Sequence, residues 1–354
     1  MAKKKKTLPK DFADLIDRKD IAALKSVFDT CEIDARGGYG KTTALSFYRI
    51  PNELVRWLVA QGADLEAVDT YNRTALHQHC SIRGGDISVF LELGANVHAL
   101  DTYGDTPLHF AAGSGFNLTA IKLLIERGAD VTALDNSKQT PLERALSRAS
   151  NIDLPNLVGV SKLLLEIDGT ITQKMKDTVT RKGEDFEFHR ENFNKDYLKE
   201  TDEALNNLYE IFDVLPVKRR IMHDGVSPIL VSGKTWQEQY EQLWELLVPS
   251  KGSAKTVQGE VVRIAGKVRD EIYRNGGCNW DANFKKMLDA LLVHYSSGNA
   301  LSTDELANAE EIVKCIRKNG DGNDDDIHLL CELATKWVLA NPNPVLLEKP
   351  SYNR

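Results

Sequence analysis

Residues 101–130 read DTYGDTPLHFAAGSGFNLTAIKLLIERGAD, and this stretch decides the fold of the first half of the chain. Its segment Thr-Pro-Leu-His at 106–109 returns three times, as Thr-Ala-Leu-Ser at 43–46, Thr-Ala-Leu-His at 74–77 and Thr-Pro-Leu-Glu at 140–143. Its last tripeptide, Gly-Ala-Asp at 128–130, returns at 62–64 and, as Gly-Ala-Asn, at 94–96. Two unrelated segments that share a spacing of 31 to 34 residues predict a solenoid of stacked helix–turn–helix repeats.

The residues of this stretch suit a pair of closely packed helices. Thr106 can cap a helix that begins at Pro107, because the missing N–H of proline costs nothing in a first turn. Ala111 and Ala112 are small enough for neighbouring helices to approach closely. Gly128 lies where the second helix must end in a left-handed residue.

The pattern resembles ankyrin repeats. The resemblance rests on Asp101, Gly104, Thr106, Pro107, Leu108, His109, Ala111, Ala112, Gly115, Leu123, Leu124, Gly128, Ala129 and Asp130. It covers residues 7–172, with about four repeats in 37–172 behind a pair of capping helices, and it implies outward β-hairpins and a protein-binding function. The first copy departs from the family pattern at Ser46, where the family has His, and the second has His79 and Cys80 in place of the alanine pair.

The whole chain is expected to be all-α, with the solenoid followed by a C-terminal helical bundle. The predicted parts are a basic disordered tail (1–6), the ankyrin domain (7–172), a connector that packs on the last repeat (173–233), an all-α domain (234–345) and a tail (346–354). Five helical stripes separated by short breaks predict the bundle. No family resemblance is evident after residue 172.

Composition narrows the class of protein. The chain has 354 residues, 42% hydrophobic and 27% charged, and no apolar run approaches the ~18 residues that a membrane span needs. No secretory signal follows the basic start, and the five scattered cysteines indicate a reducing, cytoplasmic setting. The net charge of −7 argues against nucleic-acid binding and favours a basic protein partner.

No metal or cofactor is expected. His77, His79 and Cys80 invite a zinc hypothesis, but by the resemblance they occupy the structural-histidine and alanine positions, and no second ligand cluster accompanies them. Residues 321–332 imitate a calcium loop that lacks its glycine, and residues 35–42 imitate a phosphate-binding loop at a repeat hairpin. Both imitations have plainer explanations, in helix capping and in turn formation.

Two clusters in the second half stay open as catalytic candidates. Arg219, Arg220, His223 and Asp224 crowd a glycine-bearing loop and could run acid–base chemistry. Glu260, Arg263, Lys267 and Glu271 follow helical spacing, which more simply indicates an exposed ladder of opposite charges. Neither cluster shows a nucleophile with a base and an orienting group, so no catalytic residue is assigned.

The residues expected to bind a partner lie at the hairpin tips and on the outward side of each first helix, as the resemblance implies. The tips carry Tyr39, Tyr71 and Tyr103, each 32 residues from the next, and the helix positions carry Phe47, Gln78, Phe110 and Arg144. Tyrosine is favoured in binding hot spots, although these tyrosines could instead cover the turns and pack on each other.

The sequence therefore predicts a non-enzymatic protein–protein interaction protein. A bacterial accessory role, such as an immunity protein that neutralises a toxin, is a hypothesis by analogy. The alternative is an enzyme or effector whose helical C-terminal domain does the chemistry while the repeats select the substrate.

Overall fold

The protein folds into two compact units. The structure is a computed structural model that describes residues 3–354. The repeat unit extends to Gly183 and also includes Asn194–Pro216, and the helical unit comprises Glu184–Phe193 and Val217–Arg354. The boundary therefore falls inside the segment 173–233 that was expected to be a connector. None of the described helices has both the length and the apolar character needed to cross a membrane.

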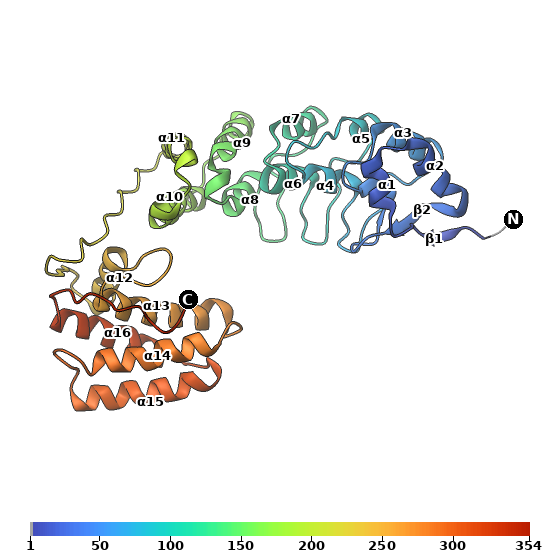
Figure 1. Cartoon of the computed structure of the whole chain (residues 1–354). Coiled ribbons are helices and arrows are strands. Elements are labelled where there is room, and N and C mark those ends of the chain that lie inside the picture. Colours follow the sequence, from blue (N-terminus) through green and yellow to red (C-terminus); the bar gives the residue numbers. More distant parts are fainter. Residues whose placement is uncertain (1–2) are drawn as a thin grey trace. The chain divides into compact units, whose positions relative to one another are not determined.

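The repeat unit is a row of helix pairs joined by long loops. Its elements are β1 (Lys5–Thr7), α1 (Phe12–Arg18), α2 (Ile21–Thr30), β2 (Cys31–Gly37), β3 (Thr42–Thr43), the 3₁₀ turn η1 (Ala44–Ser46), α3 (Asn52–Ala60), α4 (Ala75–Cys80), α5 (Ser88–Glu92), α6 (Pro107–Phe110), the π-helical turn η2 (Ala111–Gly115), α7 (Leu118–Glu126), α8 (Pro141–Arg148), η3 (Asn151–Asp153) and α9 (Leu154–Ile167). Helices α4, α6 and α8 form one row, α5, α7 and α9 form the other, and the loops project from the first row (Figure 1). The predicted solenoid is confirmed.

The first helices of the second and third repeats begin with the same hydrogen-bond device. The Thr74 and Thr106 hydroxyls accept from the backbone N–H three residues later, and His77 and His109 return Nδ1 as an acceptor for the threonine N–H. The other ring nitrogen faces the next hairpin, with His77 Nε2 3.1 Å from the Asp105 carbonyl and His109 Nε2 3.0 Å from the Gln139 carbonyl. Each histidine therefore caps one helix and ties two repeats together.

The first repeat lacks this device. With Ser46 in the histidine position, Thr43 makes no capping hydrogen bond, and its buried hydroxyl has no partner among the described residues. The segment reaches only the short 3₁₀ turn η1 instead of an α-helix. A serine side chain is too short to return a bond to the threonine N–H, so both halves of the capping box are lost.

Part of the basic start, expected as a disordered tail over residues 1–6, forms regular structure, while residues 1–2 lie outside the described residues. Lys5–Thr7 forms strand β1, which pairs in parallel with β2, and the Leu8 N–H donates to the Arg36 carbonyl at 2.9 Å. The first hairpin, where β2 pairs antiparallel with β3, has no preceding repeat to occupy its edge. The N-terminal segment fills that position, because unpaired strand edges leave backbone groups unsatisfied.

Small residues set the distance between successive repeats. Ala111 and Ala112 are fully buried, as their positions in the alanine pair predicted. At Gly115 a Cβ atom would lie 2.3 Å from the Cys80 carbonyl oxygen, so any larger residue would push the second and third repeats apart. The row ends with α11 (Lys195–Phe212), which packs on α9.

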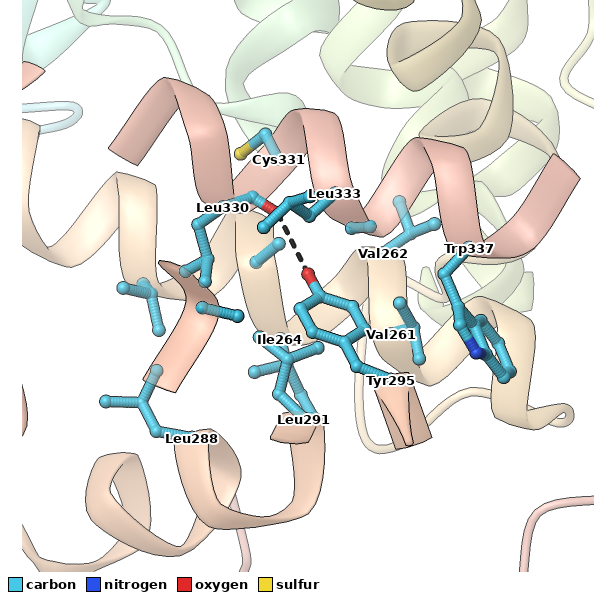
Figure 2. Close-up of a cluster of buried hydrophobic side chains, with 14 of the residues drawn as sticks. Val261, Val262, Ile264, Leu288, Leu291, Tyr295, Leu330, Cys331, Leu333 and Trp337 are labelled. Carbon is cyan, nitrogen blue, oxygen red and sulfur yellow. Dashed lines mark hydrogen bonds between the residues drawn. The ribbon is translucent and has the colours of Figure 1, made fainter. Parts of the chain in front are cut away.

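The helical unit is built mainly from five helices around one apolar core. These are α12 (Trp236–Leu247), α13 (Val257–Asn275), α14 (Ala282–Tyr295), α15 (Thr303–Asn319) and α16 (Asp324–Ala340), with α10 (Gln173–His189) and η4 (Arg190–Asn192) leading into the unit. Figure 2 shows Tyr295 among Val261, Ile264 and Leu291, with its hydroxyl donating to the Leu330 carbonyl at 2.9 Å. This bond satisfies the one polar atom of a fully buried aromatic side chain. The predicted five-helix bundle is confirmed.

Helix α13 holds a buried ion pair where an exposed charge ladder was expected. The Arg263 guanidinium donates to both carboxylate oxygens of Glu260, at 2.6 and 2.8 Å, and both side chains are almost fully buried. Burial alone would raise the pKa of Glu260, but the bonds and charge of Arg263 lower it. The expectation was wrong because the C-terminal segment covers this face: Tyr352 donates to Glu260 at 2.7 Å, and Arg263 donates to the Arg354 carbonyl at 2.7 Å.

Candidate partner-binding surface

The hairpin tips of the repeat unit are built on aspartates 32 and 34 residues apart. In each tip one aspartate oxygen, Oδ1, accepts two backbone N–H groups at 2.8–2.9 Å. The acceptor and its donors are Asp69 with Tyr71 and Arg73, Asp101 with Tyr103 and Asp105, and Asp135 with Ser137 and Gln139. These bonds hold the backbone conformation at each tip and so set the direction in which the tip side chains project.

Neighbouring tips are joined to one another through the tyrosine positions. The Thr102 N–H donates to the Tyr71 carbonyl at 2.9 Å, and the Asn136 N–H donates to the Tyr103 carbonyl at 2.9 Å. The two tyrosines therefore stand on a ladder that runs across the repeats. A side chain mounted on such a ladder is pre-positioned, which lowers the entropy cost of binding a partner.

The three predicted tip tyrosines are all exposed. Tyr39 is 98% exposed, Tyr103 57% and Tyr71 39%. The Arg73 guanidinium lies over the Tyr71 ring, 4.8 Å from its centroid. Among the described residues no ring contact joins two of these tyrosines, so the alternative in which they pack on each other finds no support in the geometry.

The four predicted first-helix positions divide into two kinds. Phe47 packs edge-on against Phe12 at a ring distance of 5.1 Å, which places it against the capping helix α1. Phe110 is half-buried beside the His77 ring. Gln78 and Arg144 instead reach their own hairpin aspartates: Gln78 donates to Asp69 Oδ2 at 3.0 Å and Arg144 donates to Asp135 Oδ2 at 3.4 Å.

Four of the seven predicted partner-binding residues line one cavity between the second and third hairpins. Its volume is about 320 Å³, at the lower end of the range of ligand sites. The predicted residues in its wall are Tyr71, Tyr103, Phe110 and Arg144, and the other wall residues are Arg73, Ser81, Asp101, Asp105, His109, Ser114 and Arg148. Tyr39, Phe47 and Gln78 lie outside this wall.

A family comparison agrees with this geometry. The family model described as ankyrin repeats (3 copies) matches residues 43–135 and 79–173. These residues are ankyrin repeats. The match does not extend to the helical unit, and a search of curated proteins gave no match. Ankyrin repeats generally mediate protein–protein interactions.

An ionic triad runs between two of the ankyrin repeats beside the cavity. Arg144 donates to Asp105 Oδ2 at 2.6 Å and reaches Asp135 Oδ2 at 3.4 Å, with all three side chains largely buried. Burial raises the pKa of Asp105, although the charge of Arg144 acts in the opposite direction. The triad ties the third repeat to the fourth through side chains as well as backbone.

The same place carries the group of potential metal ligands found among the described residues. Ligand atoms of Asp105, His109 and Asp135 lie within 4.8 Å of one another. They fit a metal poorly, because Nδ1 of His109 already accepts from the Thr106 N–H and Nε2 lies 3.0 Å from a carbonyl oxygen. The guanidinium of Arg144 already supplies the positive charge between the two carboxylates.

The loop that was a catalytic candidate uses its charged groups locally. Arg220 donates to the carbonyls of Trp244, Glu245 and Val248, at the C-terminal end of α12, where cations favour the helix dipole. Asp224 accepts from the Ser227 hydroxyl and from the N–H groups of residues 226 and 227, which lower its pKa to about 2. A carboxylate with so low a pKa is a poor proton donor at neutral pH.

His223 is the remaining group of that loop with catalytic potential. Its Nδ1 accepts from the Gly225 N–H at 3.0 Å, and its buried Nε2 has no partner among the described residues. It lies beside a cavity of about 30 Å³, large enough for a water molecule but not for a substrate. Arg219 belongs to the same segment.

Residues that the sequence reasoning missed are Arg73, Asp101, Asp105 and Arg148 of the cavity wall. The aspartates at 69, 101 and 135 follow the same 32- and 34-residue spacing as the repeats, so their shared position in the hairpins could have been predicted from the sequence. Asp105 had no such signal, because the equivalent positions hold Arg73 and Gln139. Its role comes from the reach of Arg144, which sequence spacing alone does not reveal.

Proposed function

We propose that this protein is a non-enzymatic interaction protein whose ankyrin repeats bind a protein partner through the hairpin tips and the adjoining concave face. The observation that carries the proposal is the cavity between the second and third hairpins, bordered by the exposed tyrosines Tyr71 and Tyr103. Tyrosines on a hydrogen-bonded ladder bury area at low entropic cost and keep a polar tip for specificity.

The helical unit is proposed to tether, to oligomerise or to sense, in a cytoplasmic protein. A more specific proposal is a bacterial accessory role, such as an immunity protein that neutralises a toxin. It rests on the short and degenerate repeat array and on the lack of a recognisable eukaryotic signalling domain in the sequence. The net charge of −7 supports a partner of basic character.

The competing proposal places catalysis in the helical unit. Against it, Arg220 and Asp224 are committed to a helix end and a turn, and Glu260 and Arg263 form a buried pair. In its favour stands the unpartnered Nε2 of His223. His223→Ala and Arg219→Ala separate the two proposals. An enzyme would lose its function although its fold and partner binding stay intact, whereas a binding protein would keep its function.

Partner capture from a native lysate with the full chain tests the binding proposal. One stoichiometric protein is expected with the unaltered chain, and Tyr71→Ala with Tyr103→Ala is expected to weaken its binding by about 2 kcal/mol or more. The melting temperature should barely change, because both side chains are exposed. Tyr197→Ala, an exposed tyrosine on α11 away from the tips, is the matched control. A partner that survives the double substitution, or a matched loss of stability, contradicts the proposal.

A further inference from the structure

The three hairpin aspartates of the ankyrin repeats differ in their second oxygen. Oδ2 of Asp69 accepts from Gln78 and Arg73, and Oδ2 of Asp135 accepts from Arg144. In the repeat between them Phe110 occupies the position of Gln78 and Arg144. Among the described residues, no side chain or backbone group donates to Asp101 Oδ2. The middle repeat therefore has an acceptor at the site where its neighbours have a filled bond.

A second carboxylate of the same cavity is also incompletely bonded. Asp105 Oδ2 accepts from Arg144 at 2.6 Å, but Oδ1 is buried and has no hydrogen-bond partner in the described part of the chain. The side chain is only 4% exposed. A buried carboxylate oxygen without a donor is unfavourable, so a donor that reached Oδ1 would gain more than an ordinary surface contact.

The cations around the cavity are mostly committed already. Arg73 is paired with Asp69 at 2.6 Å and lies over Tyr71, and Arg144 is held between Asp105 and Asp135. Arg148 is exposed and forms no ion pair among the described residues. The wall itself holds the carboxylates of Asp101 and Asp105, while the ion pairs of Arg73 with Asp69 and of Arg144 with Asp135 offset two of its guanidinium groups with carboxylates outside the wall. The aromatic walls add faces on which a planar cation can lie.

We propose that this cavity receives an arginine side chain of the protein partner, whose guanidinium donates to Asp101 and Asp105 while its methylenes lie along Phe110 and Tyr103. The inference rests on the proposed function and names the chemistry of the partner at that surface. Arginine fits better than lysine, because its planar group carries five donors and can serve two carboxylates and an aromatic face together.

The test uses the full chain labelled with 3-fluorotyrosine and followed by ¹⁹F NMR, with the Tyr71 and Tyr103 signals assigned by phenylalanine substitution. The probes are N-acetyl-arginine amide, the neutral isostere N-acetyl-citrulline amide and the acidic N-acetyl-glutamate amide. The arginine probe is expected to shift both signals saturably at millimolar concentration, and the citrulline probe to bind at least about tenfold more weakly.

Two substitutions remove the acceptor in different ways. Asp101→Asn keeps Oδ1 for the turn but removes the charge. Phe110→Gln keeps the charge and supplies the internal donor that Gln78 supplies to Asp69. Each is expected to weaken arginine binding about tenfold. Asp101→Asn should leave the melting temperature unchanged, whereas Phe110→Gln should lower it, because the half-buried ring of Phe110 packs on His77. Glu166→Gln removes one exposed charge away from the cavity and is expected to leave binding unchanged.

Three results overturn the inference. One is no saturable shift with the arginine probe, and another is binding that Asp101→Asn and Phe110→Gln leave intact. The third is a shift with the glutamate probe that Arg148→Ala abolishes, which would make the cavity an anion site. If any of these occurs while the double tyrosine variant still loses its captured partner, the proposed function stands and only the arginine assignment fails.

Discussion

The two units of this protein use polar side chains in opposite ways. In the repeat unit the same bonds recur, such as the Thr74–His77 and Thr106–His109 boxes, and each ties one repeat to the next. In the helical unit the buried polar groups do not follow a repeating pattern, and the Glu260–Arg263 pair is one example. A repeated device spreads stability along the row, whereas a single buried pair concentrates it in one place.

The largest effect is expected from breaking the buried pair of the helical unit. Glu260→Ala leaves the Arg263 guanidinium buried without its carboxylate, which should cost about 3–5 kcal/mol of unfolding free energy. Hydrogen exchange measured segment by segment should show the loss of protection in α13 and its neighbours, with the repeat unit unaffected.

A paired replacement controls for this effect. Glu260→Met with Arg263→Met removes both charges and keeps apolar volume, so it should cost clearly less than the single change. Equal losses of unfolding free energy from the single and the double variant would mean that the unpaired charge of Arg263 costs nothing beyond lost packing. That result would contradict the contrast drawn between the two units.

Acid is expected to weaken the repeat unit through its buried histidines. Burial lowers the pKa of His77 and of His79 below the ordinary value of 6.5, despite nearby carbonyl hydrogen bonds. The unfolded chain therefore binds more protons than the folded one below about pH 6.5. Stability is retained above that pH and falls as the pH drops, by at most about 1.4 kcal/mol per pH unit for each histidine.

Urea unfolding of the repeat unit at several pH values between 7.5 and 5.5 measures this dependence. His98→Gln, a change at an exposed histidine, should leave the slope intact. His77→Gln should reduce the slope while lowering stability at pH 7.5, because the link to the Asp105 carbonyl is lost. A flat pH profile in the unaltered protein would contradict the prediction.

Capping threonines provide a direct comparison of the two units. Thr106→Ala removes a buried hydroxyl that contacts His109 as well as the helix, and we expect a loss of about 2 kcal/mol. Thr235→Ala removes an exposed cap of α12 and should cost about 0.5 kcal/mol. Equal costs by chemical denaturation would argue that the bond to the histidine adds nothing.

The smallest expected effect is a gain in the first repeat. Ser46→His introduces the residue that the second and third repeats use, and it offers a bond to the Thr43 hydroxyl, which has no partner among the described residues. Stability should rise by about 0.5–1 kcal/mol. Thr43→Ala combined with Ser46→His removes the gain if capping is its cause. A gain that persists in the double variant would point to another origin.

Much of the repeat unit could be predicted from the sequence because its spacing repeats in three dimensions. Thr106, Ala111 and Gly128 each have a local role that the chain dictates, and the structure shows them capping, packing and turning as expected. The tip tyrosines also followed from the repeat spacing. In the helical unit the five helices followed from their apolar stripes and end signals, such as the capping box at Ser302 and Glu305.

What the sequence could not supply was the set of contacts between segments far apart in the chain. The Glu260–Arg263 pair has the spacing of a surface ladder, but the C-terminal segment with Tyr352 packs over it and buries it. Asp105 joins Arg144, 39 residues away, and Asp101 lacks the side-chain donor that Gln78 supplies to Asp69, because Phe110 occupies the equivalent position. Local spacing therefore determined the helices and the turns, since their hydrogen bonds are short-range. Tertiary packing decided which charges are buried and which acceptors stay free, because burial and pairing depend on whatever segment lies opposite.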